Sequence, residues 1–492
     1  MKPKFFKYWF WWPIDTYDNY QSDTPPVMQL DRNIYATLVS EYIDGKVEGI
    51  LAKKWVISTD GRTWTFYLRT DLKFDDGTPI TPAIVLLNFK RILWLTRKSG
   101  LVLNSLLPEV SSWKNMNSKS NVIFLKNDSQ LVFKFSRRPI GLFSQLGQPI
   151  YSVVSPKCFS RNGRWRTPYC AIASGQYSVI GRGKNFIDLK SRGIFKTVKN
   201  SPKFVRIEWP VRSGDSVVKA IGDGRADLTV EHSFGLSKKT LVTLRKESVR
   251  TIYEPPVRMH FVDLNAKRFP FNNKTLRQKF RDLFLYKLSH DRDFLSSGIK
   301  VNDSFIPRGG VGYEYFPIPH IKVKEKSRVI GTAEVLLYPL SADPKIQHAI
   351  DNCVIETLRE LGIEPKIRRY TDRFVPFNKM RRGKFDVMVR GTGILVNNPY
   401  GDLRMMFMSK IGANIPDPSG QIPDLIRKAE VEQNGRKRAG LVKKINQIMF
   451  NDASIITFAH SSLVYLYRGK VNFRHYNLFE DPIEFRAIGW QK

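Results

Sequence analysis

Residues 51–91 read LAKKWVISTDGRTWTFYLRTDLKFDDGTPITPAIVLLNFKR. The part that starts at Trp55 is typical of a strand, and the Asp-Gly pair at 60–61 favours a tight turn because glycine adopts a positive φ at little cost. Large apolar and polar side chains then alternate over residues 64–69, as they do on a strand with one buried face. The pattern predicts a β-hairpin.

A helix is predicted to follow the hairpin. An Asp-Asp-Gly turn at 75–77 leads to Thr81 and Pro82. Threonine can cap a helix by accepting a hydrogen bond from a backbone N–H, and the fixed φ of proline suits the first helical position. We expect this helix to run to about Leu95.

The order of these features resembles the signature of the extracytoplasmic solute-binding proteins of peptide/nickel-type ABC transporters, also called the oligopeptide-binding protein family or solute-binding protein family 5. The pattern in that family is L-A-x-x-W, then D-G-x-x-x-T-F-x-L-R, then K-F-x-D-G-T-P. One departure is that Ala83 and Ile84 stand where the family usually has acidic residues. The positions that agree are Leu51, Ala52, Trp55, Asp60, Gly61, Thr65, Phe66, Leu68, Arg69, Lys73, Phe74, Asp76, Gly77, Thr78, Pro79 and Thr81.

The resemblance implies an α/β, two-lobed periplasmic-binding-protein fold. Its mixed sheets would be flanked by helices, and an additional α+β domain would be inserted in the first lobe. The expected boundaries are 1–33, 148–255 and 468–492 for lobe I, 34–147 for the additional domain, and 256–467 for lobe II.

Local patterns add two expectations about secondary structure. Residues 334–338 and 363–369 read as strands on either side of a helix with one apolar face, which is a βαβ unit and predicts a parallel sheet. Ile34, Leu38 and Tyr42 recur every fourth residue, so we expect a helix over residues 31–43.

The composition is that of a globular chain. It has 492 residues, of which 42% are hydrophobic, and this length suggests two or three folding units. The longest apolar run, residues 8–14, is far shorter than the roughly 18 residues that a membrane helix needs. The N-terminus is basic but has no small-residue cleavage site, so we expect a mature periplasmic or extracytoplasmic protein whose leader has been removed.

Three cysteines are too few for a disulfide scaffold. Cys158 and Cys170 flank a loop that one disulfide could close in an oxidising compartment, and either state of this pair is compatible with the sequence. Cys353 lies on an apolar helix face and is expected in the core.

The charge is strongly basic, with 80 Lys and Arg against 45 Asp and Glu, a formal net charge of +35. Such a balance attracts nucleic acid, acidic lipid surfaces or anionic solutes. The basic residues are spread along the chain and not massed in one arm. This distribution favours a general excess of positive charge on the surface over a dedicated binding site.

The sequence has no signature of covalent chemistry. It contains no Cys or His cluster with metal-ligand spacing, no P-loop, no dinucleotide fingerprint and no G-x-S-x-G elbow. We therefore expect a binding protein and not an enzyme, with no metal and no cofactor.

Ligand-binding residues are inferred mainly from the resemblance. The loop after the first strand lies at the ligand cleft in that family, so Trp11 and Trp12 are candidates for stacking on a ligand, although core packing is the commoner role of such residues. The family's usual acid for a peptide ammonium lies in a W-x-A-D-Y-x-x-P segment. The corresponding stretch here is 392–399, and Leu395 occupies the place of the acid.

An aliphatic side chain cannot stabilise a buried ammonium, and leaving that charge unpaired is costly. We predict that the protein does not hold a free peptide N-terminus in the usual way. Either the ligand is not a zwitterionic peptide, or another acid such as Asp402 or Glu254 substitutes.

Arg258 and Arg390 lie beside the predicted cleft segments. Each could bind a carboxylate or phosphate through two parallel hydrogen bonds, and an ion pair within the protein is the commoner alternative. The complete set of candidate ligand-binding residues is Trp11, Trp12, Tyr253, Arg258, Arg390, Thr392, Leu395, Asn397 and Tyr400.

These inferences predict an extracytoplasmic solute-binding protein. It would capture a peptide or another small ligand, an anionic one being favoured by the charge, in an interlobe cleft and deliver it to an ABC transporter permease. The expected partners are that ligand and the membrane permease, with no nucleic acid, and the protein is expected to be a monomer. The alternatives are a ligand-sensing domain of this fold, or a basic protein that binds nucleic acid or anionic surfaces, whose binding would fall steeply with salt.

Overall fold

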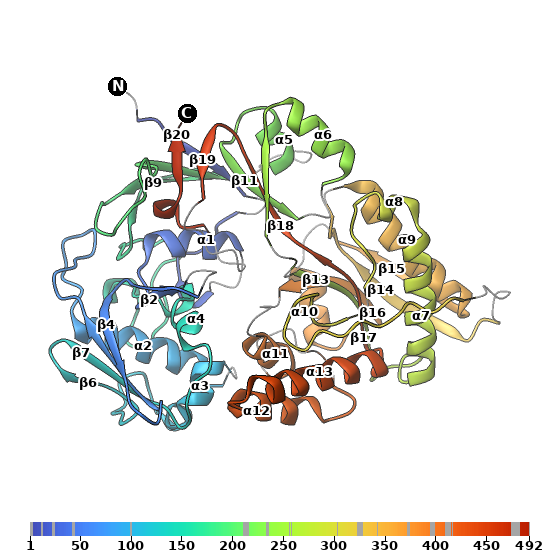
Figure 1. Cartoon of the computed structure of the whole chain (residues 1–492), viewed down its shortest axis with the longest axis horizontal. Helices are drawn as coiled ribbons and strands as arrows, with labels where there is room; N and C mark the ends of the chain where they lie inside the picture. The colour runs from blue at the N-terminus through green and yellow to red at the C-terminus, as the bar shows by residue number, and fades with distance from the viewer. Residues whose placement is uncertain are drawn as a thin grey trace. The chain divides into compact units, whose positions relative to one another are not determined.

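The chain forms two compact units in a computed structural model (Figure 1). Unit 1 comprises residues 1–230, 247–252 and 465–492, and unit 2 comprises 231–246 and 253–464. The chain passes from one unit to the other four times: within β11 (Leu228–His232), between α6 (Lys238–Lys246) and β12 (Arg250–Tyr253), within β12, and within β18 (Leu463–Tyr467). The structure describes residues 3–10, 13–21, 25–41, 45–98, 101–209, 216–232, 236–254, 256, 258–302, 304–321, 328–341, 343–370, 374–393, 399–408, 415, 417–473 and 483–491.

Unit 1 is built on a seven-stranded mixed sheet with the order β12-β18-β11-β1-β10-β9-β8. Strand β1 is parallel to β10 and β11, while β9 is antiparallel to β10 and β8. Strands β1, β8, β10 and β11 therefore all end at one side of the sheet, which we call the carboxyl edge of unit 1. The strands are β1 (Phe6–Trp9), β8 (Tyr177–Arg182), β9 (Phe186–Ser191), β10 (Phe204–Glu208), β11 (Leu228–His232), β12 (Arg250–Tyr253) and β18 (Leu463–Tyr467).

The hairpin predicted from residues 51–91 is confirmed. Strands β4 (Ala52–Ile57) and β5 (Thr63–Leu68) pair antiparallel, and α2 (Pro82–Thr96) follows with the Thr81 hydroxyl accepting a hydrogen bond from the Ile84 N–H at 3.3 Å. The hairpin belongs to a four-stranded sheet, β4-β5-β7-β6, completed by β7 (Gln130–Lys134) and β6 (Ile123–Asn127).

This region has a hydrophobic core of its own, whose buried members lie between Ala36 and Val153. That core supports treating residues 34–147 as an additional domain, and its boundaries, like those of the two lobes, stay a prediction. The smaller elements of unit 1 are β2 (Val39–Glu41), β3 (Val47–Gly49), α3 (Val102–Leu106), α4 (Leu142–Leu146), α5 (Val217–Gly222), β19 (Lys470–Asn472) and β20 (Gly489–Gln491).

The helix predicted over residues 31–43 is wrong. The structure places α1 at Pro25–Ile34 and then turns the chain into β2. Proline is tolerated in the first turn of a helix, where its missing N–H is not needed, so Pro25 and Pro26 can begin α1.

Unit 2 contains a five-stranded sheet with the order β15-β14-β16-β13-β17. The predicted βαβ unit is confirmed, because β14 (Gly331–Leu337) and β15 (Ile363–Arg369) are parallel and α9 (Pro344–Glu360) connects them. The central strands are β16 (Val387–Gly393) and β13 (Arg258–Leu264), and β17 (Ile455–Ser461) lies at the edge.

Helices cover both faces of this sheet (Figure 1). One apolar core joins it to α7 (Lys274–His290), α8 (Arg292–Leu295) and α9, and a second joins it to α11 (Tyr400–Phe407), α12 (Ile422–Val431) and α13 (Gly435–Asp452). The remaining helices of unit 2 are α6 (Lys238–Lys246) and α10 (Phe374–Arg381).

A buried arginine connects distant parts of unit 1. Arg91 on α2 is fully buried and donates hydrogen bonds to the Asp18 carboxylate at 2.6 Å, the Asn19 side-chain oxygen at 2.7 Å and the Gly163 carbonyl at 2.7 Å. Its guanidinium carbon lies 5.0 Å from the ring centroid of Phe159. The contacts join α2 to the loop after β1 and to the loop that contains residues 159–163.

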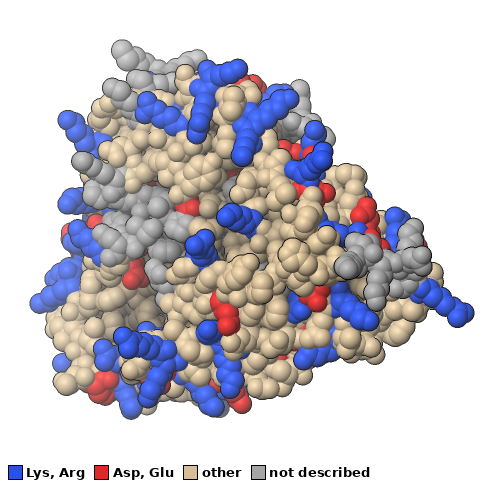
Figure 2. All heavy atoms as spheres, turned by 45° about the vertical axis from the view of Figure 1, so that its right-hand side comes forward, with Lys and Arg blue, Asp and Glu red and all other residues tan. Residues whose placement is uncertain are grey.

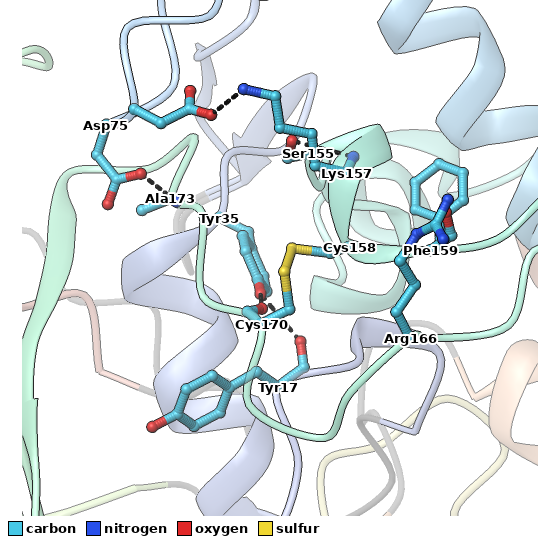
Figure 3. Close-up of a disulfide and its surroundings, with 11 residues drawn as sticks. Tyr17, Tyr35, Asp75, Ser155, Lys157, Cys158, Phe159, Arg166, Cys170 and Ala173 are labelled. Atoms are coloured by element: carbon cyan, nitrogen blue, oxygen red, sulfur yellow. Dashed lines mark hydrogen bonds and ion pairs between the residues drawn. A yellow bond between two sulfur atoms is a disulfide. The ribbon is translucent and has the colours of Figure 1, made fainter.

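The second of these loops is closed by a disulfide between Cys158 and Cys170, which are 12 residues apart (Figure 3). The same region binds the turn at 75–77, because the Ala173 N–H donates to the Asp75 carboxylate at 2.9 Å and the Lys157 ammonium lies 2.7 Å from the Asp76 carboxylate. The remaining cysteine, Cys353, is buried as expected.

Replacing Arg91 with methionine tests how much of the fold depends on this contact. The variant would leave the Asp18 carboxylate buried without its cation, so we expect Arg91→Met to lower the free energy of unfolding by about 3–5 kcal/mol. Arg164, which is exposed in the same loop, provides the control, and Arg164→Met should change stability by less than about 0.5 kcal/mol. Urea unfolding followed by circular dichroism measures both. An Arg91→Met protein as stable as the control would contradict the prediction.

Candidate functional site

In unit 2, two of the predicted residues lie where β16 ends and β13 begins. Arg258, the first residue of β13, lies opposite Gly393 on β16 and Ser461 on β17. Thr392 lies opposite Met259, so Arg258 and Thr392 occupy neighbouring positions on adjacent strands. Both are partly exposed. The backbones of these two candidates are therefore neighbours at the end of the sheet, while their side chains point to opposite faces of it.

A buried histidine, which the sequence did not single out, lies beside Arg258. His260 has its Nε2 atom 2.6 Å from the Ser461 hydroxyl oxygen, and the side chain is buried. Burial, followed by the electrostatic effects of Arg258 and His460, holds the pKa of His260 well below its usual range. The ring is therefore neutral at physiological pH.

His460 lies on β17 opposite Met259. Burial lowers its pKa to about 4, although a hydrogen bond to the Phe305 carbonyl acts in the opposite direction. Within the described part of the chain, the Nε2 atom of His460 has no hydrogen-bond partner. A carbonyl can only accept, so the other ring nitrogen carries the proton and Nε2 is left as a buried acceptor.

Arg390 has the commoner of its two predicted roles. Its guanidinium is buried and forms an ion pair with the Asp263 carboxylate of the neighbouring strand, and it lies 4.6 Å from the Phe261 ring centroid. Burial raises the pKa of Asp263, and the charge of Arg390 and its hydrogen bond offset part of that effect. The pair is a structural contact inside unit 2, and this geometry does not support a ligand contact by Arg390.

Tyr400 is also part of the packing. It is buried at the start of α11, and the Arg438 guanidinium lies 5.5 Å from its ring centroid. Tyr253, in contrast, is half exposed at the end of β12, and Glu254 next to it is buried. The candidates Trp11, Trp12, Leu395 and Asn397 lie outside the described residues.

A small pocket in unit 1 is lined by Arg32, Gln176, Glu484 and Arg486 among others. Its charges pair with one another, because Glu484 lies 2.7 Å from Arg486 and 3.7 Å from Arg32. Burial raises the pKa of Glu484, but the two arginines outweigh it and the net shift is downward. The cluster fixes the C-terminal segment to α1.

Neither a metal centre nor a membrane span is found among the described residues. No group of three or more His, Cys, Asp or Glu side chains there could hold a metal ion. No described helix is both long enough and apolar enough to cross a bilayer. Figure 2 shows Lys and Arg side chains scattered over the viewed face, as expected for a general excess of positive charge on the surface.

Comparison with known proteins identifies the relatives of this chain. Residues 46–280 match the model of the bacterial extracellular solute-binding proteins, family 5 Middle. The resemblance to the family 5 solute-binding proteins that the sequence predicts is thereby confirmed. The relative named probable D,D-dipeptide-binding periplasmic protein DdpA, from Escherichia coli K12, is 22% identical over 460 residues, which are 88% of this chain and 85% of that protein.

One further relative and one solved structure are also similar to this chain. The glutathione-binding protein GsiB of Escherichia coli K12 is 23% identical over 54% of this chain, and the match spans about half of GsiB, 48%. The solved structure of Haemophilus influenzae OppA in complex with RPPGFSPFR has a TM-score of 0.79 and 16% identity, covering 99% of each chain. The two-lobed periplasmic-binding-protein fold predicted from the sequence is thereby confirmed.

Sequence reasoning missed the His260, Ser461 and His460 cluster. His260 and Ser461 are 201 residues apart, and no local pattern relates them. The available signal is that these polar residues stand in otherwise apolar segments, near the start of β13 and at the end of β17.

The depressed pKa of His460 makes stability depend on pH. The ordinary pKa of histidine is about 6.5, so between about pH 6.5 and about pH 4 the unfolded chain binds a proton at this residue that the folded protein does not bind. Stability therefore falls as the pH falls. We expect wild type to lose about 1–2 kcal/mol more than His460→Asn between about pH 6.5 and about pH 5, as measured by urea unfolding.

Asparagine keeps a donor near the Phe305 carbonyl but does not titrate, and the carboxylates contribute equally in both proteins. Identical pH slopes for the two proteins would show that His460 is not held neutral in the folded state.

Proposed function

We propose that this protein captures a peptide or another small, anionic ligand outside the cytoplasm and delivers it to an ABC transporter permease. Similarity to the family 5 solute-binding proteins carries the proposal. Binding would shift the protein between open and closed forms, to the extent that the ligand makes stronger contacts in the closed form. No covalent step is part of the proposal.

The proposal also concerns the chemical class of the ligand. The relatives are named for a D,D-dipeptide and for glutathione, and OppA is solved with RPPGFSPFR, so peptide-like ligands are the natural first candidates. Leu395 stands in place of the family's usual acid, which argues against a site for a free peptide ammonium. The partly exposed Arg258 at the start of β13 and the net charge of +35 both favour an anionic ligand.

The remaining parts of the proposal follow the family. The family description is extracellular, which supports a periplasmic or other extracytoplasmic location. We propose that the protein acts as a monomer, that its protein partner is the membrane permease, and that it does not bind nucleic acid.

Ligand binding can be tested by thermal shift, because a ligand that binds only the folded protein raises the apparent melting temperature. The screen would contain short peptides with free and with acetylated N-termini, sugars, opines and metal chelates, and native mass spectrometry would detect any ligand that survives purification. We expect at least one anionic compound to stabilise the protein. We also expect acetylation of a peptide to leave its affinity unchanged, because Leu395 makes no ion pair with an ammonium.

A pair of variants tests the role of position 395. Leu395→Asp should strengthen binding of free peptides over acetylated ones by about tenfold, while the uncharged Leu395→Asn should not. Tight binding by wild type that disappears on acetylation would contradict the proposed ligand class. Asp402→Asn and Glu254→Gln would then show which acid takes the place of residue 395. Loss of all binding at moderate salt, with no ligand-linked stabilisation, would favour a general polyanion binder.

A further inference from the structure

One arginine at the carboxyl edge of unit 1 is held in a fixed orientation and has no ion-pair partner among the described residues. Arg182 is the last residue of β8, and it is exposed. The edge where β8 ends is also where the parallel strands β1, β10 and β11 end. In open α/β sheets, ligands bind outside the carboxyl ends of the strands. The position is therefore one from which a side chain can reach a ligand.

The guanidinium of Arg182 is fixed by two hydrogen bonds. Nη1 donates to the Tyr17 hydroxyl at 3.1 Å, and Nη2 donates to the carbonyl of Ile14 at 2.8 Å. Both acceptors belong to the loop that follows β1. An arginine side chain ordinarily has several rotamers of similar energy, and these contacts select one of them.

Aromatic rings complete the support. The guanidinium carbon lies 3.8 Å from the ring centroid of Tyr169, 5.5 Å from that of Tyr17 and 5.9 Å from that of Trp209. The rings of Tyr17 and Tyr169 are themselves in edge contact, with centroids 5.5 Å apart. A cation over an aromatic face is attracted by the ring quadrupole, so the three rings hold the guanidinium in place without cancelling its charge.

The supporting rings are anchored in turn by the disulfide loop. Tyr169 directly precedes Cys170, and the Tyr17 N–H donates to the Pro168 carbonyl at 2.8 Å. The Tyr35 hydroxyl lies 3.0 Å from the Tyr17 carbonyl and 3.4 Å from the Cys170 carbonyl, between the two segments (Figure 3). The disulfide thus fixes the backbone next to Tyr169, whose ring supports the Arg182 guanidinium.

Part of the guanidinium stays available. Arginine has five N–H donors, and Arg182 uses two of them within the described residues. Within those residues no carboxylate lies in ion-pair range of Arg182, whereas Arg206 on strand β10 of the same sheet pairs with Asp188 at 2.6 Å. Contacts within the described residues therefore orient this cation and leave three of its five N–H donors without a partner there.

We propose that Arg182 is a binding residue for a carboxylate of the ligand, which it receives through two parallel N–H donors. The inference rests on the proposed function and adds to it a recognition group in unit 1. A guanidinium with a fixed plane loses little entropy on binding, so its contribution to affinity is larger than that of a mobile surface arginine.

A purely structural role makes a different prediction. If Arg182 only held the loop after β1, its replacement would lower the stability of the protein. Any change in affinity would then be the same for the C-terminal acids and for the C-terminal amides. If it binds a carboxylate, its replacement removes the difference between the acid and its amide.

The experiment compares matched ligands on the full-length protein with its disulfide intact. N-acetylated di- and tripeptides, each as the C-terminal acid and as the C-terminal amide, are titrated by calorimetry into wild type, Arg182→Gln, Arg182→Lys and the control Lys184→Gln. Lys184 is exposed in the same hairpin turn. We expect Arg182→Gln to weaken binding of the acids by about 10- to 100-fold and to leave the amides unchanged. Arg182→Lys should weaken binding of the acids by an intermediate factor, and Lys184→Gln should not change it.

Each result is decisive. Equal affinity for the acids in wild type and Arg182→Gln would overturn the inference while leaving the proposed function intact. A wild-type protein that binds no member of this panel or of the wider screen would overturn both. Melting temperatures and near-ultraviolet circular dichroism of the unliganded variants confirm that the proteins compared are folded.

Discussion

The arrangement of unit 1 depends on the buried cation of Arg91. A guanidinium with no exposed surface is tolerated only where its charge and its donors are matched, because the cost of removing it from water is large. Its partners come from residues 18–19 and 163, so the helix after the hairpin, the loop after β1 and the disulfide loop must all be in place together. Removing any one of them would leave a buried charge unsatisfied. The contact therefore makes three distant segments of the chain mutually dependent.

The parts of the fold that the sequence predicts are those governed by neighbouring residues. The hairpin of β4 and β5, the cap of α2 and the βαβ unit of unit 2 follow from turn residues and apolar periodicity. The error at residues 31–43 has the same origin. A four-residue spacing of apolar side chains is also produced by a helix end followed by a buried strand, and Leu38 and Val39 are buried in a core and not on a helix. Only tertiary packing distinguishes the two cases.

The candidate site was harder to predict because its groups meet across strands. Arg258 and Thr392 were found through the resemblance, and the register of β13 and β16 places them at neighbouring positions of adjacent strands, with their side chains on opposite faces of the sheet. The same register brings Arg390 next to Asp263, a pairing that no spacing within the sequence reveals. His260, His460 and Ser461 were missed for the same reason, since each is an isolated polar residue in its own segment. A contact between strands is determined by register, which depends on the whole sheet.

Net charge alone does not locate a binding group in this protein. Three of the described arginines, Arg91, Arg277 and Arg390, are buried and paired with Asp18, Asp452 and Asp263. Lysines and arginines on the face shown in Figure 2 are scattered over it. In a paired buried arginine the carboxylate already occupies the donors, and in a mobile surface lysine the entropy of fixing the side chain offsets much of the attraction. Arg182 belongs to neither class, because rings fix it and no carboxylate among the described residues neutralises it. A ligand carboxylate would bind a pair of donors that the fold already orients, so little side-chain entropy would be lost on binding. This orientation, more than the number of positive charges, distinguishes a recognition group from a general excess of surface charge.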